Sequence, residues 1–465
     1  MRTLISLTVF FNAIATLFSQ EISGTWQGEL NVQGTKLEIV FHIEKQADGY
    51  TSLMDSPTQG GYGISTTKTT FDNGKIEIVI SILAVFYQGT LKNDSIIGTF
   101  NQNGMPFPLS LGKTEKKTQL RPQEPKEPYS YTVEEIVFIN PKEKIELAGT
   151  LTLPQQKEKH PAVILIAGSG PNDRDETIFG HKPFWLLADY LTRHGIAVLR
   201  YDKRGVGKSE GEYFLATTQD FADDAESALN YLKTRKEIDS SHIGLIGHSE
   251  GGIIAPMIAA KNEDISFIVL MAGLGVSGVD LSLAQNQFAF NKTSLSITEK
   301  ELLNERLKDI YNSVLSWEGY VGSETERTSL KQELGELWDN LPTEIQHTVL
   351  KDAFIEKTTS NIATPWFRYF LLTTPSDYLK NVSIPVLAIN GENDTQVDYK
   401  TNLALIENAL KKGNNKHYTI KSYPQLNHLF QESTTGEIDE YGKIEQTMSP
   451  KVMEDVTNWI EAQIK

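Results

Sequence analysis

Cysteine is absent from this chain of 465 residues, so disulfide bonds, cysteine-ligated zinc and iron–sulfur clusters are excluded. Histidine is scarce as well. The nine histidines include no His-Glu-x-x-His pair, which leaves a zinc peptidase without support. We therefore expect no metal site in this protein.

Positive charge is also in short supply. Lysine and arginine number 44 against 60 aspartate and glutamate residues, which gives a formal net charge of −16. Because phosphate binding needs clustered basic side chains, we expect no nucleic-acid partner. The composition, with 39% hydrophobic and 22% charged residues, is that of a globular protein. At roughly 100–200 residues per domain, the length predicts two or three units.

A long apolar run occurs only at the N-terminus. One positive charge precedes the run Leu4–Phe18, and small or polar residues follow it. This pattern is typical of a signal peptide and is too short for a stable membrane span. We expect residues 1–20 to be a signal peptide and the protein to be secreted or periplasmic, with no membrane span. A buried N-terminal helix is the alternative.

Residues 21–113 show only β-type patterns. Short runs of alternating apolar residues are separated by turns such as Asp72-Asn73-Gly74. Examples of the expected strands are Thr25–Val32, Lys36–Ile43, Lys75–Ile82, Val85–Leu91, Ser95–Phe100 and Phe107–Leu111. The pattern predicts a small antiparallel barrel or sandwich without a catalytic constellation. Residues 114–130, with three prolines and many charges, predict a linker.

Residues 131–465 alternate between β-type and helical patterns. Two β-type runs come first, and short continuous Val/Ile/Leu runs separated by helical segments follow. Such runs are typical of strands buried on both faces, so we expect an α/β fold with a mostly parallel sheet and helices on both sides. Residues from about 275 to 380 show helical spacing only and predict a helical cap inserted into the sheet domain.

Residues Gly247–Gly251 read Gly-His-Ser-Glu-Gly, the Gly-x-Ser-x-Gly pattern. The pattern follows the predicted strand Ile243–Ile246 and precedes a helix rich in small and apolar residues. A turn this tight strains the serine backbone, needs small neighbours, and points the free amides of the helix at the site. The sequence therefore predicts Ser249 as a nucleophile. An ordinary glycine-rich turn is the alternative.

A nucleophilic serine needs a base, and the base needs an acid. With this type of strand–turn–helix, the acid follows the serine along the chain and the histidine comes last. Asp394 lies in the loop beyond the carboxyl end of a predicted strand, at the edge of the sheet where such sites lie. We predict Asp394 as the acid, with Glu392 in the same loop as the competing carboxylate.

Two histidines follow Asp394. His417 opens a predicted strand at its amino end, whereas His428 follows the last predicted strand at its carboxyl end. Since the serine is expected at the carboxyl edge of the sheet, His428 is the predicted base.

The tetrahedral intermediate of acyl transfer needs two backbone amides aimed at one point. The amide of Glu250, directly after the serine, would supply one of them. The other should come from the loop that follows the predicted strand Pro161–Ile166, where Ser169 is our first choice and Gly168 is close behind. These groups complete an acyl-transfer mechanism that needs no cofactor.

Together, these motifs resemble those of the α/β hydrolases, in particular bacterial carboxylesterases similar to the EstD-type esterases, near the prolyl-oligopeptidase-like hydrolases. The resemblance is carried by Ala167–Asp175, Tyr201–Ser209, Gly247–Gly251, Gly391–Asp394 and Asn427-His428. It spans residues 131–465 and leaves the β segment outside. It implies cleavage of short or medium acyl esters, with a small-molecule ester as the substrate.

Two other functions stay open from the sequence. A serine peptidase or acylaminoacyl hydrolase would use the same groups, although such peptidases usually carry a propeller of several hundred residues where this chain has only residues 21–113. A non-catalytic binding protein on a hydrolase scaffold is the other, and the intact set of serine, aspartate and histidine argues against it. In the helical cap, Trp366 and Phe370 are candidates for lining the acyl pocket, with core packing as the alternative.

Overall fold

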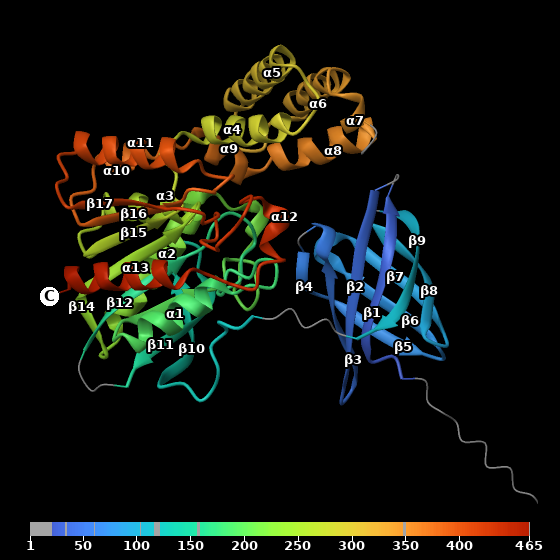
Figure 1. Cartoon of the computed structure of the whole chain (residues 1–465), viewed down its shortest axis with the longest axis horizontal. Coiled ribbons are helices and arrows are strands. Elements are labelled where there is room, and N and C mark those ends of the chain that lie inside the picture. Colours follow the sequence, from blue (N-terminus) through green and yellow to red (C-terminus); the bar gives the residue numbers. More distant parts are fainter. Residues whose placement is uncertain are drawn as a thin grey trace, which may run out of the picture. The chain divides into compact units, whose positions relative to one another are not determined.

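The computed structural model describes residues 21–32, 35–59, 61–102, 104–115, 121–155, 159–346 and 350–464. The predicted signal peptide, residues 1–20, lies outside the described residues. The chain forms two compact units, one that ends at Lys117 and one that spans Thr118–Lys465 (Figure 1).

The first unit is a closed antiparallel β-barrel. Its strands are β1 (Gly24–Val32), β2 (Thr35–Gln46), β3 (Gly49–Ser56), β4 (Gly61–Ser65), β5 (Lys68–Asp72), β6 (Lys75–Ile80), β7 (Val85–Lys92), β8 (Ser95–Gln102) and β9 (Met105–Thr114). They pair in the order β2-β1-β9-β8-β7-β6-β5-β3, and β3 pairs back to β2 to close the ring, while β4 pairs with β3. Of the two predicted architectures, the structure therefore shows the barrel. Strands β3, β4 and β5 lie within the predicted β segment but outside the six example runs.

The barrel has a hydrophobic core of its own. Alternate residues of the strands point inward, and Trp26, Phe41 and Tyr87 are among the largest buried side chains. The rings of Phe41 and Tyr87 stack with centroids 5.4 Å apart, and the indole N–H of Trp26 donates to the carbonyl of Ile22 over 2.7 Å. Closure pairs the strands all the way around, so the unit can bury its apolar face without a second layer.

The second unit is built on an eight-stranded sheet. Its strands are β10 (Tyr131–Asn140), β11 (Ile145–Pro154), β12 (His160–Ile166), β13 (Ala197–Tyr201), β14 (Ile238–His248), β15 (Phe267–Met271), β16 (Val386–Gly391) and β17 (Tyr418–Tyr423). The order is β10-β11-β13-β12-β14-β15-β16-β17. The first two strands are antiparallel, and β13 to β17 and β12 run parallel. The predicted α/β fold class is confirmed.

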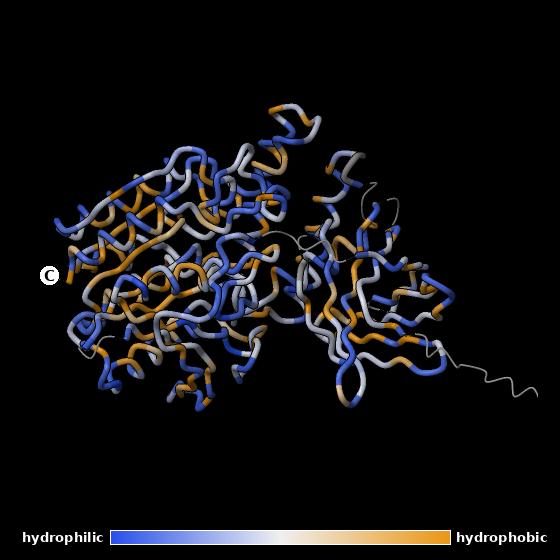
Figure 2. Tube along the Cα trace, turned by 60° about the horizontal axis from the view of Figure 1, so that its bottom comes forward, coloured by the Kyte–Doolittle hydropathy of each residue, from blue (hydrophilic) through white to orange (hydrophobic). Residues whose placement is uncertain are grey.

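Helices cover both faces of this sheet. They are α1 (Pro183–Arg193), α2 (Thr218–Thr234), α3 (Gly251–Ala259), α10 (Ser376–Leu379), α11 (Tyr399–Lys412), α12 (Ile438–Tyr441) and α13 (Pro450–Gln463). Side chains of α1 and α13 bury one face, while those of α2, α3 and α11 bury the other. Residues 162–166 and 267–271, in the centre of the sheet, are therefore apolar throughout. In Figure 2 hydrophobic colour gathers in the interior of this unit.

The predicted helical cap lies between β15 and β16. It comprises α4 (Gly278–Asn291), α5 (Ile297–Leu315), α6 (Glu324–Asp339), α7 (Thr343–Gln346), α8 (Lys351–Ile362) and α9 (Pro365–Leu372), which gather in one layer in Figure 1. Ser296 and Ser323 begin α5 and α6 with capping boxes, and Leu307, Leu334 and Trp338 belong to a separate core within the cap. Within the described ranges, no helix has the length and apolar character needed to cross a membrane.

Residues 121–130, which the sequence predicts as part of a linker, lie against the rest of the second unit. The guanidinium of Arg121 donates to backbone carbonyls of Phe179 and Gly442, at 2.8 and 3.3 Å. The side-chain amide of Gln123 donates to the carbonyl of Met448 over 2.7 Å. This part of the predicted linker is therefore held to the second unit.

Candidate active site

The candidate nucleophile lies on a sharp turn between β14 and α3. Ser249 has a φ of 52°, a left-handed conformation that costs on the order of 1–3 kcal/mol in a residue with a side chain. Its amide donates to the carbonyl of Met271 over 2.9 Å. The chain crowds closely here: a Cβ on Gly247 would lie 1.9 Å from the carbonyl oxygen of Gly251, and one on Gly251 would lie 2.0 Å from that of Ile166. Strand, turn and helix therefore have the geometry that the sequence motif requires.

His428 and Asp394 are in contact in the loops that follow β17 and β16. Nδ1 of His428 lies 2.7 Å from Oδ2 of Asp394, and both residues are buried. The other carboxylate oxygen accepts the amides of Gln396 and Val397 at 2.8 and 2.9 Å. The carboxylate is thus fixed in place, and Nδ1 of the imidazole must carry the proton that points at it, which leaves Nε2 to accept one.

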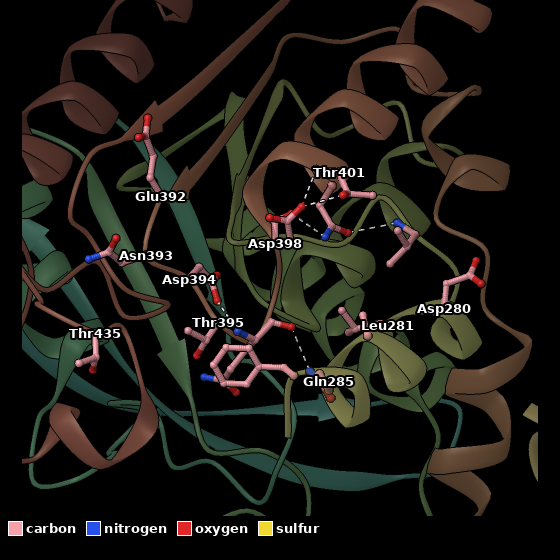
Figure 3. A pocket seen from close by; sticks show the side chains of 15 residues that line it. Asp280, Leu281, Gln285, Glu392, Asn393, Asp394, Thr395, Asp398, Thr401 and Thr435 are labelled. Carbon is pink, nitrogen blue, oxygen red and sulfur yellow. Dashed lines mark hydrogen bonds between the residues drawn. The ribbon is translucent and has the colours of Figure 1, made fainter. Parts of the chain in front are cut away.

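The competing residues lie elsewhere. The carboxylate of Glu392 accepts the hydroxyl of Ser422 over 2.8 Å, and in Figure 3 its side chain points away from Asp394. His417 is exposed just before β17 begins, at the amino end of that strand. The structure therefore brings His428 together with Asp394 and leaves the two alternatives out.

Two free backbone amides lie beside the candidate nucleophile. A Cβ built on Gly168 would come within 3.1 Å of the Cβ of Ser249, so the loop after β12 touches the serine. The amide of Gly168 itself is occupied, because it donates to Oε1 of Glu176 over 2.6 Å. The amides of Ser169 and Glu250 have no hydrogen-bond partner in the part of the chain that the structure describes. Of the two candidates in this loop, Ser169 is the one whose amide remains available for an oxyanion.

The side chain of Glu250 is buried and bonded to three other segments. Its Oε1 accepts the indole N–H of Trp366 over 2.7 Å and the hydroxyl of Thr218 over 2.8 Å. The ammonium of Lys203 lies 3.3 Å from its Oε2 and donates to the carbonyl of Gly168 over 2.6 Å. These partners offset the cost of burying the carboxylate. They also tie both sides of the candidate oxyanion hole to the cap helix α9.

The two aromatic residues predicted for the acyl pocket stack on each other in α9. The ring centroids of Trp366 and Phe370 are 5.2 Å apart. Phe370 is buried in the core of the sheet unit, whereas Trp366 is half-buried and reaches Glu250 with its N–H. Trp366 is therefore connected to the residue that follows the nucleophile, and Phe370 supports it. Their role in lining an acyl pocket stays a prediction.

A cavity of about 410 Å³ opens between α4 and the loop after β16 (Figure 3). Asp394 and Gln396 form part of its wall, together with Leu281 and Gln285 of the cap. The side chain of Gln285 donates to the carbonyl of Gln396 over 3.1 Å, which links cap and loop at this place. Neither Ser249 nor His428 lines the cavity, so it borders the acid but not the atoms that would meet a substrate carbonyl.

A second buried histidine lies beside the candidate nucleophile, and no sequence pattern pointed to its partner. Nδ1 of His248 is 2.9 Å from Oε1 of Glu176, and Nε2 is 3.0 Å from the backbone carbonyl of His428. Burial on its own lowers the pKa of His248. The charge of Glu176 and the hydrogen bonds to Glu176 and to the carbonyl of His428 outweigh burial, so the pKa of His248 is raised.

His181 is a third buried histidine, and it stays neutral. Nδ1 lies 2.9 Å from the hydroxyl of Thr447, and Nε2 lies 3.0 Å from the carbonyl of Tyr441. Burial, followed by the positive charge of Arg121, lowers the pKa of His181 to about 4. The contacts join the segment before α1 to the segment before α13.

We expect this histidine to make the second unit sensitive to acid. An unfolded histidine takes up a proton below about pH 6.5, whereas His181 in the fold does so only near pH 4, so acid favours the unfolded state between these values. The free energy of unfolding should fall by roughly 3 kcal/mol across this window through His181 alone. Urea titrations at a series of pH values should show a flatter dependence in His181→Gln. An equally steep fall in both proteins would contradict the assignment.

The sheet order, the strained serine turn and the His–Asp contact are those of an α/β hydrolase. Residues 184–433 match the sequence profile of the family described as serine aminopeptidase, S33, and the chain belongs to this family of hydrolases. The predicted resemblance to α/β hydrolases is confirmed.

The chain is also similar to individual proteins. The chain is 29% identical over 280 residues to esterase EstD of Thermotoga maritima. The aligned region covers 57% of this chain and 62% of EstD, so this chain spans less than two thirds of that relative. An esterase of Pyrococcus furiosus is similar in structure, with a TM-score of 0.42 and 14% identity over 72% of this chain and 91% of that one. Est1E of Butyrivibrio proteoclasticus, solved with ferulic acid bound, gives a TM-score of 0.40 and 18% identity over 71% and 99%.

Proposed function

We propose that this protein is a carboxylesterase-type serine hydrolase that cleaves carboxylic esters through an acyl-enzyme. The observation that carries the proposal is the contact of His428 with Asp394 in loops on the same side of the sheet as the strained Ser249. Nε2 of His428 takes the proton from the serine oxygen as that oxygen attacks the acyl carbon, and Asp394 stabilises the imidazolium. The amides of Ser169 and Glu250 bind the oxyanion.

In the remaining steps His428 returns the proton, and the alcohol and then the acid are released. When the tetrahedral intermediate collapses, the bond to the alcohol breaks and His428 protonates the departing oxygen. The acyl group stays on Ser249. A water molecule that gives its proton to His428 then attacks the acyl carbon, and the carboxylic acid leaves as the serine regains its proton.

An aminopeptidase or acylaminoacyl hydrolase is the second candidate, because the family description names a serine aminopeptidase. The same groups would serve amide cleavage. A panel of nitrophenyl esters, acetylated sugars and aminoacyl amides separates the two, and we expect turnover of the esters to be the faster. Turnover of aminoacyl amides with little ester cleavage would favour the peptidase. A fluorophosphonate probe should label Ser249 in either case, and no labelling would favour a non-catalytic binding protein.

We also propose that the protein acts outside the cytoplasm, as a secreted or periplasmic enzyme. The support is the sequence Leu4–Phe18 and the residues around it. Mass spectrometry of the protein expressed in a bacterial host should find a chain that begins near residue 20 in the periplasmic or culture fraction. An uncut chain in the cytoplasmic fraction would speak against the proposal.

Changes at the stacked aromatics of α9 should alter acyl-chain preference. Trp366→Ala and Phe370→Leu enlarge the space beside the candidate site, so the ratio of kcat/KM on nitrophenyl octanoate to that on nitrophenyl acetate should change more than the acetate value itself. Trp366→Phe is the milder comparison, because it keeps one aromatic ring while it removes the indole N–H that bonds Glu250. An unchanged ratio in the first two variants would count against a cap-shaped pocket.

The barrel should be dispensable for small substrates. A truncated chain that begins at Thr118 keeps the contacts of Arg121 and Gln123, and we expect it to cleave nitrophenyl acetate within tenfold of the full chain. A chain that begins at residue 131 loses those contacts and should be less stable to heat. The chain that begins at Thr118 decides the question. If it is folded and soluble but its kcat/KM falls more than tenfold, about 1.4 kcal/mol in the barrier, the barrel helps to form the site.

A further inference from the structure

Both ring nitrogens of His248 face oxygen atoms that accept hydrogen bonds. A carbonyl oxygen carries no hydrogen, so Nε2 of His248 must donate its own proton to the carbonyl of His428 over 3.0 Å. A second proton must lie between Nδ1 and Oε1 of Glu176, because two lone pairs 2.9 Å apart would repel each other. This contact therefore holds one proton more than a neutral imidazole beside a carboxylate would.

The surroundings favour an imidazolium beside a carboxylate. Oε1 of Glu176 also accepts the amide of Gly168 over 2.6 Å, a short contact of the kind that a charged oxygen makes. Glu176 and His248 are 4% and 7% exposed. Each charge alone would be costly at this burial, but the ion pair is neutral as a whole. Its neutrality matters because His428, with its ring centroid 4.8 Å from that of His248, becomes positive during turnover.

Among the described residues, two other ionisable groups act on His248 or lie against it. Asp394, in the loop after β16, acts on it through its charge, and His428 lies in the loop after β17. The remaining neighbours that line the space beside Glu176 and His248 are apolar: Pro183, Phe184, Met271, Leu429, Phe430 and Met448. In these surroundings Glu176 is the principal group that keeps the second proton on His248.

We propose that Glu176 and His248 are a positioning pair that fixes three parts of the active site relative to one another. Gly168 precedes Ser169, whose amide is the proposed oxyanion donor. His248 precedes the nucleophile. The third contact is made to the backbone of the base, His428, itself. The pair therefore reaches each reacting group within one residue. The expected effect of the pair on catalysis rests on the proposed esterase function, whereas the double protonation of His248 does not.

Glu176→Gln tests the pair with almost no change in shape. The amide oxygen can still accept the amide of Gly168, but without the negative charge His248 keeps one proton and loses one of its two hydrogen bonds. We expect kcat on nitrophenyl acetate to fall by about 10- to 100-fold with KM little changed, because the oxyanion loop or the base shifts. The alkaline limb of the profile of kcat against pH should also differ between Glu176→Gln and the wild type.

His242→Gln is the matched control. His242 also contacts a carboxylate, with Nδ1 2.8 Å from Oδ2 of Asp239, but this pair is partly exposed on β14, away from the turn. We expect it to keep wild-type kcat. Wild-type kinetics in folded Glu176→Gln would overturn the positioning role.

A second measurement does not depend on turnover. In the full chain labelled with 15N-histidine, the ring signals of His248, identified by their loss in His248→Gln, should show a bound proton on both nitrogens at pH 7. In Glu176→Gln they should show one. A single protonated nitrogen in the wild type would overturn the proposal even if the esterase is active. If instead no ester is cleaved while both protons are seen, the proposed function fails and the ion pair stands.

Discussion

Ser249→Ala should lose ester turnover by about 10³- to 10⁶-fold while its fold is kept. The substitution removes the oxygen that forms the acyl bond, whereas the Cβ and the left-handed backbone at φ 52° remain, so the turn itself has no reason to change. The measurement is kcat on nitrophenyl acetate, with near-ultraviolet circular dichroism to check the fold.

Ser241→Ala is the control for this variant, since Ser241 is an exposed residue of β14 whose hydroxyl, among the described residues, bonds Asp239 and His242. It should keep full activity. Residual activity of Ser249→Ala above about 1% of wild type would contradict the assignment of the nucleophile.

His428→Ala should lower kcat as severely as Ser249→Ala, and His417→Ala should leave it nearly unchanged. The first variant removes the only ring in contact with Asp394 among the described histidines, and the second removes an exposed ring at the amino end of β17. The two variants form a matched pair, because both histidines flank the same strand. Similar losses in the two would mean that the catalytic edge of the sheet has been misplaced.

The sheet of the second unit was readable from the sequence because its strands are buried on both faces. Residues 162–166 and 267–271 are apolar throughout, and each forms the interior of a parallel strand. No other kind of element combines such short length with such continuous apolar character. The antiparallel strands β10 and β11 were found as well, because each forms a short β-type run ahead of the alternating segments.

Strands β3, β4 and β5 of the barrel, which the six example runs leave out, differ from the others because part of their inward side is polar. Ser52 of β3 and Thr69 of β5 point inward, and their hydroxyls lie 2.7 Å apart, with Thr66 bonded to both. These hydroxyls satisfy one another, so the strands are stable without the apolar alternation that would reveal them. Only the pairing to distant strands makes them β-structure, and a local pattern cannot contain that information.

In the candidate site, too, some residues could be predicted from local sequence patterns and others could not. Ser249, Asp394 and His428 could be named because the order along the chain and the edge of the sheet restrict each choice to one or two residues. Glu176 and Lys203 could not, because their contacts with His248 and Glu250 join segments that are far apart in sequence, and nothing in the local sequence of either loop sets the residue apart.

The crowding around the serine turn bears on how this enzyme could change its substrate during evolution. Positions 247 and 251 admit no side chain at all without moving backbone atoms. Almost no substitutions at these positions are therefore available to evolution for changing the position of Ser249. The cap, with its own separate core, is free of that restriction except where α9 meets Glu250 and at Gly278, where a Cβ would lie 1.9 Å from the carbonyl oxygen of Phe370. New specificities should arise by divergence of residues 278–372, while the turn stays as it is, and a library randomised in the cap should yield more active variants than one of equal size randomised in the turn.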